Sequence, residues 1–342
     1  MYKLLKIIAM IKQFHLVFTL LFVLMTSCNL TSEKDPHFSK EEILESELMP
    51  LKEISSPFRI EIKHPFLILQ NDEKLRDRMF HIYDLTTNEL KYVFGKMGEG
   101  PEEFTLPWLV RTSLPDLMII DNFSFYRYSI NKDGISIPKD TLKTQYINIL
   151  SDASLINDSL FVVDAQYTGP YVYLCSITDE TPKKSWKYRN PNIMDPFIDP
   201  NRGEVYANDR RIVFCYKYKK QIDFMDTQFN LVKSVKYDYI EPTNIAERPG
   251  EDKISYIDAY LGKRYLYAMF MGVTENEHRA NLWREAHLEV YDMDGNTVKR
   301  FILKGKRPIY FAVDEKTFTL YGVIPDGDPE DNLLVYKLKG LS

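Results

Sequence analysis

A short apolar strand recurs six times along the chain at nearly even spacing. Its copies span residues 66–70, 117–121, 160–164, 211–215, 265–270 and 319–324. Successive copies begin 51, 43, 51, 54 and 54 residues apart. A repeat of this period is typical of chains in which one supersecondary unit is copied several times, such as solenoids and propellers. We therefore expect a repeat architecture for most of the 342 residues.

Each copy is surrounded by further strand-like segments. A second strand that alternates apolar and polar residues follows at 79–85, 124–130, 171–177, 221–227, 287–293 and 332–338. Turn residues such as Asp294-Gly295-Asn296 come after several of these. Third strands lie at 90–95, 231–239 and 297–303, and a strand precedes the apolar one at 58–63, 146–150, 254–260 and 309–313. Four antiparallel strands per copy, repeated radially, predict an all-β, six-bladed β-propeller.

The last copy lacks one strand, because the chain reaches Ser342 soon after the strand at 332–338. A spare strand lies near the other end, at 46–54. We expect this N-terminal strand to complete the last blade and to cover an edge that would otherwise pair with other chains. Ser39 and Glu42 have the spacing of a helix capping box, which favours a short helix over 39–48 just before that strand.

The first 27 residues carry three lysines and no acidic residue, and an apolar run from Phe14 to Met25 precedes Cys28. This pattern is typical of a secretory signal, and the run is shorter than the roughly 20 apolar residues of a transmembrane helix. A cysteine directly after small residues predicts a lipoprotein signal, with lipid on Cys28; an ordinary cleaved signal and an uncleaved anchor are the alternatives. Met1 and Met10 are both possible starts.

These features divide the chain into a signal peptide at 1–27, a lipidated tether at 28–45 and the propeller at 46–342. The expected location is the cell envelope, as a lipoprotein of the outer membrane. Whether the propeller faces the periplasm or the cell surface stays open. Without the signal, 41 basic residues stand against 49 acidic ones, since three of the 44 basic residues lie in the signal. This balance argues against nucleic acid as a partner and leaves an envelope protein, peptide or glycan.

Cysteine and histidine usage gives no metal site or cofactor. Cys175 and Cys215 lie in apolar strand-like runs, which favours two buried thiols, although an exported pair is also able to form a disulfide. Two cysteines and scattered histidines do not make a zinc site. No local catalytic motif such as GxSxG is present, so we assign no catalytic residue.

The segment GKMGEGPEEFTLP, from Gly95 to Pro107, is the sharpest motif of the chain. It resembles the segment that joins successive blades in six-bladed NHL-type propellers and, more closely, in TolB-like propeller lipoproteins of the Gram-negative envelope. The GxxGxGPxEF positions are Gly95, Gly98, Gly100, Pro101, Glu103 and Phe104. The resemblance implies a binding scaffold. A phosphate-cradling loop needs Lys-Ser/Thr after the glycines, so the motif favours a conformational role between blades.

Several polar and aromatic residues follow the apolar strands and are candidates for a binding site. The acids Asp72, Asp121 and Asp164 either bind a ligand at a mouth of the propeller or cap turns through backbone N–H groups. Residues at the same level that suit glycans, peptides or interblade packing are Trp108, Arg111, Asn122, Tyr167, Tyr216 and Lys217. The charged insertion at 273–287, which contains Trp283, is either a partner surface or a solvated loop.

Two functions remain compatible with this pattern. The first is a non-enzymatic module that binds a protein, peptide or glycan in the envelope. The second is a hydrolase or lyase that acts on glycan or peptide with acids at the propeller mouth, since propellers host both activities. Acids from three or more blades that converge on one pocket would favour the enzyme.

Overall fold

The computed structural model describes residues 38–53, 56–71, 77–100, 103–122, 124–131, 134–135, 141–143, 153–164, 171–179, 181–190, 192–193, 199–237, 252–280, 285–324 and 332–341. The chain divides into two compact units, Met1–Ser39 and Lys40–Ser342. The larger unit carries all of the strands described below. None of the helices in the described ranges is long and apolar enough to cross a membrane.

Three sheets of the larger unit have four strands each. The first contains β3 (Pro57–Lys63), β4 (Phe66–Asn71), β5 (Phe80–Asp84) and β6 (Glu89–Phe94). The second contains β19 (Gly203–Ala207), β20 (Ile212–Tyr216), β21 (Gln221–Met225) and β22 (Leu231–Lys236). The third contains β27 (Tyr310–Asp314), β28 (Thr319–Val323), β29 (Asn332–Lys337) and the N-terminal strand β2 (Glu47–Pro50).

An eight-stranded sheet holds two antiparallel runs of four. One run is β9 (Pro107–Thr112), β10 (Leu117–Asp121), β11 (Ser124–Tyr128) and β14 (Thr141–Lys143). The other is β15 (Ala153–Leu155), β16 (Leu160–Asp164), β17 (Tyr171–Ser176) and β18 (Lys184–Lys187). Parallel pairing of β15 with β9 joins the two runs. The strand expected at 146–150 lies outside the described residues. The strand that precedes β16 in the described chain is β15, which begins at Ala153.

The remaining long sheet has five strands. They are β23 (Lys253–Leu261), β24 (Tyr265–Thr274), β25 (Ala286–Asp292), β26 (Thr297–Lys304) and β1 (Glu41–Glu45). The short helix α2 (Glu275–Ala280) follows β24. Two small ladders, β7 (Lys96–Met97) with β8 (Glu103–Phe104) and β12 (Ile130–Asn131) with β13 (Gly134–Ile135), complete the described strands.

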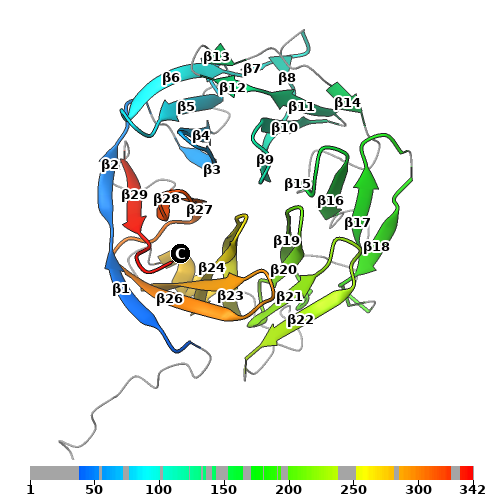
Figure 1. The fold of residues 1–342 in the computed structure, drawn as a ribbon, viewed down its shortest axis with the longest axis vertical. Helices are drawn as coiled ribbons and strands as arrows, with labels where there is room; N and C mark the ends of the chain where they lie inside the picture. The colour runs from blue at the N-terminus through cyan, green and yellow to red at the C-terminus, as the bar shows by residue number, and fades with distance from the viewer. Residues whose placement is uncertain are drawn as a thin grey trace, which may run out of the picture. The chain divides into compact units, whose positions relative to one another are not determined.

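The sheets stand around a common axis, and the fold is an all-β propeller (Figure 1). The inner strands β3, β9, β15, β19, β23 and β27 contact one another in this order, and β27 contacts β3 again. Each second strand is packed between neighbouring sheets, and every residue of β4, β10, β20 and β28 is buried. This burial explains why these strands are continuous apolar runs in the sequence.

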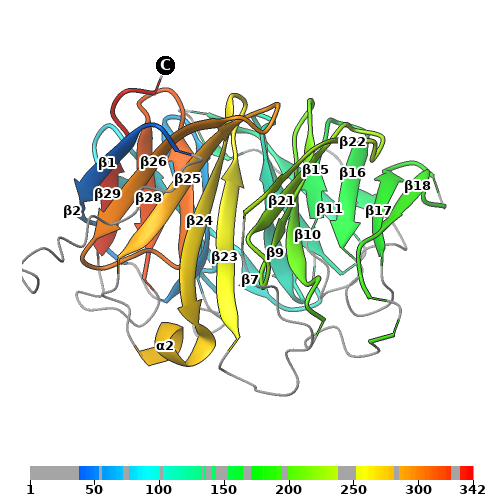
Figure 2. The same cartoon turned by 90° about the horizontal axis from the view of Figure 1, so that it is seen from below.

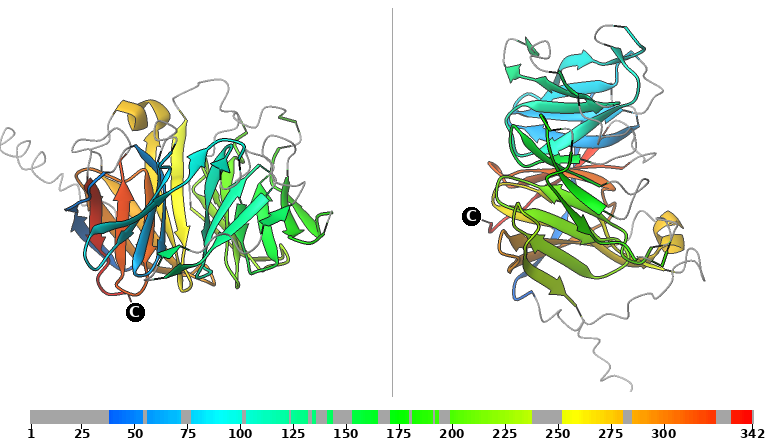
Figure 3. Two further views of the ribbon diagram at one scale, coloured as in Figure 1. Left: turned by 90° about the horizontal axis from the view of Figure 1, so that it is seen from above. Right: turned by 90° about the vertical axis from the view of Figure 1, so that its right-hand side faces the viewer.

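The inner strands define two ends of the propeller. Lys253, where β23 begins, pairs with Thr274, where β24 ends and α2 follows. The end at which the inner strands begin is therefore the α2 mouth, and Figures 2 and 3 show the helix on this side. The hairpin turns that leave β3, β9, β23 and β27 surround the opposite end, which we name the turn mouth.

The N-terminal segment binds two neighbouring sheets. Strand β2 pairs antiparallel with β29, as expected for the closing strand. Residues Glu41–Glu45 were expected in a helix and in the tether, but they form β1, which pairs in parallel with β26. Arg300 donates to the Glu41 carboxylate and Lys299 Nζ lies 2.5 Å from Glu42 Oε2, so the acids that favour a helix locally are used as partners of a strand.

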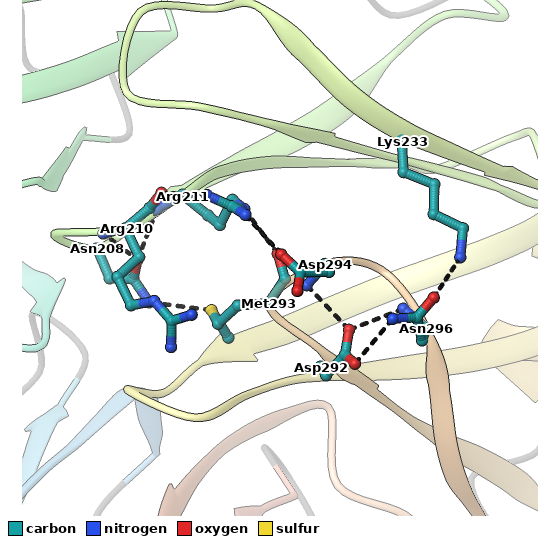
Figure 4. A network of polar contacts seen from close by, with 8 residues as sticks. All are labelled: Asn208, Arg210, Arg211, Lys233, Asp292, Met293, Asp294 and Asn296. Atoms are coloured by element: carbon teal, nitrogen blue, oxygen red, sulfur yellow. Dashed lines mark hydrogen bonds and ion pairs between the residues drawn. The ribbon is translucent and has the colours of Figure 1, made fainter.

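Polar side chains of one sheet bind the turn between β25 and β26 of the next sheet (Figure 4). Arg211, just ahead of β20, donates from Nε to Met293 O at 2.7 Å and from Nη2 to Asp294 Oδ1 at 2.6 Å, both just after β25. Lys233 Nζ donates to Asn296 Oδ1 at 2.8 Å. Asp292 shapes this turn by accepting the N–H groups of Asp294 and Asn296. These bonds fix the sheet of β19–β22 against the sheet of β23–β26.

The glycine-rich segment forms a compact connection after the first sheet. Gly95 has φ +88°, and a Cβ atom there would lie 2.6 Å from Phe80 Cδ2, so only glycine fits. Glu103 accepts from Gly100 N at 3.0 Å and from Lys96 Nζ at 2.6 Å. Phe104 is buried and packs edge-on against Phe80 at 5.9 Å. Gly98 N donates to Phe104 O, whereas Pro101 lies outside the described residues.

Candidate functional site

A cavity of about 390 Å3 lies at the α2 mouth. Four carboxylates line it, and they come from β16, β19, β23 and α2: Asp164, Glu204, Asp258 and Glu275. The basic and imidazole side chains in its lining are Arg202, Lys217 and His278, and its tyrosines are Tyr206, Tyr256 and Tyr310. The acids thus come from three antiparallel groups of four strands, β15–β18, β19–β22 and β23–β26, and they converge on one pocket.

The inner side of this cavity carries an ion pair across the propeller axis. Arg111 of β9 donates from Nη1 and Nη2 to the two carboxylate oxygens of Asp258 of β23, at 2.6 and 3.1 Å. Arg111 also donates to Ala259 O at 2.7 Å, and Phe311 N donates to Asp258. Burial alone would lower the pKa of Arg111, but the nearby Asp258, Tyr206 and Glu204 together outweigh burial and raise that pKa well above its ordinary value. The guanidinium therefore stays charged.

Tyrosine hydroxyls hold two of the other cavity acids. Tyr206 donates to Glu204 Oε2 at 2.6 Å and accepts from Ala259 N at 3.0 Å. Tyr188 donates to Asp164 Oδ1 at 2.7 Å. Burial, followed by the nearby Glu204 and Asp258 carboxylates, raises the pKa of Tyr206, so its hydroxyl keeps its proton and remains a donor. These bonds orient the carboxylates in the cavity.

The helix α2 forms part of the cavity wall, and a cap stabilises its first turn. Thr274 and Glu277 make a reciprocal capping box, in which Thr274 N donates to Glu277 Oε2 at 2.9 Å and Glu277 N donates to Thr274 Oγ1 at 3.2 Å. The fully buried Arg307 Nη2 lies 2.9 Å from His278 Nδ1. Glu275 Oε1 lies 3.9 Å from Lys217 Nζ. The helix is thus anchored to the rim of the propeller.

A second buried acid lies beside the cavity in the five-stranded sheet. Glu289 of β25 has no exposed surface and accepts from Tyr256 at 2.8 Å and from Tyr291 at 2.7 Å. Lys220 Nζ lies 3.7 Å from its other oxygen and 4.0 Å from the ring centre of Tyr237. Burial raises the pKa of Glu289, although Lys220 opposes this shift. Tyr256 links this cluster to the cavity wall.

The residues singled out from the sequence are only partly brought together. Asp164 and Lys217 line the cavity, and Arg111 lies one layer deeper. Asp72, Tyr167 and Trp283 lie outside the described residues, as does Cys28.

The other candidates make contacts within the fold. Trp108 packs against Phe58 and lies under Arg59, whose Cζ is 4.5 Å from the ring centre. Asp121 accepts from Thr105 N and Leu106 N, and thereby caps the end of the glycine-rich segment. Tyr216 donates to Asp223 at 2.8 Å, and Asn122 occupies a turn with φ +53°. These contacts favour the turn-capping and packing interpretation for this group.

The sequence reasoning missed Glu204, Tyr206 and Asp258. A signal for the two acids exists, because each interrupts a short apolar strand that precedes a repeat copy, as Asp258 does in ISYIDAY. An acid at such a position on an inner strand faces the axis of a propeller, where its neighbours come from other blades.

Cys175 and Cys215 are both free and buried, as the apolar runs around them indicate. Burial raises the pKa of Cys175 to about 12, and it raises that of Cys215 as well, so both stay as thiols. Within the described ranges, no group of three or more His, Cys, Asp or Glu side chains is placed to hold a metal ion.

Comparison with known proteins places the chain. A family model described as TolB-like 6-blade propeller-like matches residues 37–316. The chain belongs to this family. Among solved structures, a member of the DUF4221 family from Bacteroides vulgatus has a TM-score of 0.53 at 14% identity, covering 86% of this chain and 97% of that one. A protein of Bacteroides fragilis whose name describes it as exported has a TM-score of 0.52 at 12% identity, covering 87% and 97%.

At these identities the two solved structures establish the fold and nothing further. The comparison with curated protein sequences gives no match. The function must therefore be inferred from the residues of this chain.

Proposed function

We propose that this TolB-like protein is a lipid-anchored binding module of the cell envelope, with six blades and a ligand site at the α2 mouth. The observation that carries the proposal is the cavity of about 390 Å3 whose charged and hydroxyl groups are oriented by buried partners. Such a pre-formed concave site with a few convergent polar groups is what small-ligand and chain-end recognition requires. The ligand is a protein segment, a peptide or a glycan.

The arrangement of the sheets supports the proposed count of six blades. The eight-stranded sheet contains two complete antiparallel runs of four strands. Counted as two blades, with the four other long sheets, they make six, in agreement with the description of the family model. In this arrangement the last blade is closed by β2.

The proposed address rests on the N-terminal sequence and on one neighbour. The lysines, the apolar run and Cys28 have the order of a lipoprotein signal, and the Bacteroides fragilis protein is named as exported. Metabolic labelling with a clickable fatty acid tests the anchor: the wild-type protein should be labelled and Cys28→Ala should not. Equal labelling of both proteins would rule out this attachment site.

The α2 mouth suits binding at a closed site rather than passage through the propeller. The Arg111–Asp258 pair and Tyr206 cross the axis beneath the cavity. A ligand that enters from the α2 mouth therefore meets fixed carboxylates, a guanidinium and hydroxyl groups at its inner end. These groups match the hydroxyls and amides of a glycan or the ends of a peptide.

An enzyme is the second candidate, and the convergence of acids from three four-strand groups favours it. A glycosidase needs one protonated and one ionised carboxyl group, about 5–9.5 Å apart, on either side of the scissile bond. In this cavity Asp258 is held by Arg111, and hydroxyl donors hold Glu204 and Asp164. A carboxylate engaged in this way orients a ligand more readily than it transfers a proton.

Partner capture from membranes tests the binding module. The wild-type protein should recover a defined partner after crosslinking, and Glu204→Gln/Lys217→Met should lose it. Glu47→Gln/Lys236→Met, on exposed positions of β2 and β22, is the matched control and should retain the partner. Equal recovery with both variants would exclude the α2 mouth.

Cleavage assays separate the two candidates. Envelope glycan and peptide fragments incubated with the wild-type protein should be bound without being cut. Turnover that is lost in Glu204→Gln or Asp164→Asn would favour the hydrolase or lyase instead.

A further inference from the structure

A second cavity, of about 770 Å3, lies at the turn mouth, away from the site proposed above. It is lined by the turns after β3, β9, β23 and β27. Its walls include the apolar side chains of Phe66, Leu114, Pro115, Ile130 and Val313. A pocket of this size accommodates a drug-sized molecule.

Acidic residues outnumber basic ones at the α2 mouth, whereas basic residues outnumber acidic ones at the turn mouth. The α2 mouth has four acids against Arg202 and Lys217. The turn mouth has Lys63, Lys263, Arg264 and Lys316 against two acids. Glu61 is buried behind Lys63, with Oε1 3.2 Å from its Nζ, and offsets that lysine. The positive surplus of the turn mouth therefore rests on the other three side chains.

The two acids of the turn mouth are occupied by the turns themselves. Glu315 accepts from the N–H groups of Lys263, Arg264 and Tyr265 at 2.8–3.3 Å. Asp314 Oδ1 accepts from Lys316 N at 3.0 Å. Its Oδ2 accepts from the Thr317 hydroxyl at 2.9 Å and lies 3.0 Å from His64 Nδ1. These carboxylates hold two hairpin turns in place, and their lone pairs are directed at backbone and hydroxyl donors.

The lysines that these turns display have no such partner. Lys263 and Lys316 are exposed, and in the part of the chain that the structure describes neither ammonium forms an ion pair. Arg264 is fixed beside them, because it donates to Glu315 O and its Cζ lies 4.4 Å from the ring centre of Phe318. Cations held at the rim of an apolar pocket, with acids turned away, favour an anion.

We propose that the turn mouth is a second binding site, which takes a small anion with an apolar body and a carboxylate or phosphate head. The apolar walls accept the body, and Lys263, Arg264 and Lys316 receive the head. This site is independent of the α2 mouth, because the Arg111–Asp258 pair lies between the two on the axis. One propeller would then hold two ligands of different chemistry.

Titration calorimetry of the full chain with three probes of one shape tests the proposal. The probes are 2-naphthoate, 2-naphthyl phosphate and the neutral 2-naphthalenemethanol. At least one anion should bind at a single saturable site, and the neutral probe should bind about tenfold or more weakly, because it lacks charge-assisted bonds. The preferred anion identifies the head group as carboxylate or phosphate.

Charge reversal locates the site. Lys263→Glu/Lys316→Glu should weaken anion binding by about tenfold or more, and Lys263→Arg/Lys316→Arg should preserve it. The matched control, Lys187→Glu/Lys236→Glu, makes the same charge change on exposed positions of β18 and β22 and should change the affinity by no more than about twofold. Circular dichroism melting shows that the variants are folded.

Four results would overturn the proposal. Three are the absence of saturable binding by either anion, equal affinity for the neutral probe, and undiminished binding by the Lys263→Glu/Lys316→Glu protein. Loss of anion binding in Lys217→Glu alone would move the site to the α2 mouth and would also contradict the proposal.

Discussion

Arg111 of β9 and Asp258 of β23 form a bidentate ion pair, with 2.6 and 3.1 Å between donors and acceptors, that joins inner strands on opposite sides of the propeller. Two inner strands separate them in either direction around the ring. The side chains are 17% and 4% exposed, so the pair works in a largely dry environment. It links strands that are 147 residues apart in the sequence.

Removal of one partner from this pair should be costly. Arg111→Met leaves the Asp258 carboxylate buried without its cation, and we expect the free energy of unfolding to fall by about 3–5 kcal/mol. Arg111→Met/Asp258→Asn should lose less than the sum of the two single variants, since no lone charge remains. Urea unfolding of the four proteins measures this coupling. Strictly additive losses would show that the pair does not act as a unit.

The buried Glu289 should make stability depend on pH. Its pKa is raised by burial, so the folded state holds the proton more tightly than the unfolded state. Stability should therefore fall as pH rises from the ordinary value near 4.5 toward the raised value, by at most about 1.4 kcal/mol per pH unit. In Glu289→Gln this loss should be absent, although Lys220, Tyr256, Tyr291 and Arg300 still face the site.

Unfolding measured from pH 4 to 8 tests this dependence, with Glu47→Gln on the exposed face of β2 as the control. The difference in stability between wild-type and Glu289→Gln should change with pH, and the control should run parallel to wild type. Parallel curves for all three proteins would contradict the prediction.

Gly95 should be required for its contacts as well as its backbone conformation. Gly95→Ala combines a positive φ of +88° with a Cβ atom 2.6 Å from Phe80, whereas Gly305→Ala has φ +85° and no atom within 4 Å of its Cβ. We expect about 1–2 kcal/mol of strain in both variants and a further 1–3 kcal/mol, roughly, from the clash in Gly95→Ala. Thermal or urea unfolding compares the two, and equal losses would remove the packing argument.

The strand β1 should contribute to stability although it lies outside the four-strand pattern. A chain that begins at residue 46 loses five paired residues and the buried Leu44, and should be less stable than one that begins at residue 40 by about 2–4 kcal/mol. A chain that begins at residue 52 also lacks β2, exposes the edge of β29 and should associate. Unfolding and size-exclusion chromatography measure the two effects. Equal stability of the first two chains would assign β1 no role.

Most of the fold could be predicted because the repeat is visible in the local sequence, as short apolar strands at regular spacing. The apolar copies at 66–70, 117–121 and 160–164 coincide with β4, β10 and β16 to within one residue. These strands are buried on both faces, and short continuous apolar runs between turn residues are typical of such strands. The pairing of β2 with β29 followed from the missing strand of the last copy.

The start of the propeller and most of the candidate site could not be predicted in this way. Residues 41–45 read locally as the first turn of a helix, and only the partner strand β26, more than 250 residues away, makes them a strand. Arg111 was a candidate, but its partner Asp258 lies on a strand on the opposite side of the propeller. The repeat pattern predicts where a residue lies along its own strand, but it does not predict which side chains contact it across the axis. Tertiary contacts decided both cases.

The parallel pairing of β1 has a mechanical consequence. Any load applied through the chain ahead of residue 40 reaches β1 first. In a parallel pair pulled along the strand, the bonds between Glu41–Glu45 and β26 are sheared together rather than opened one by one. The load must break this group before it reaches β2, which closes the ring. Strand β1 thus protects the β2–β29 pair, because the β1–β26 bonds resist a pulling force on the N-terminal segment first.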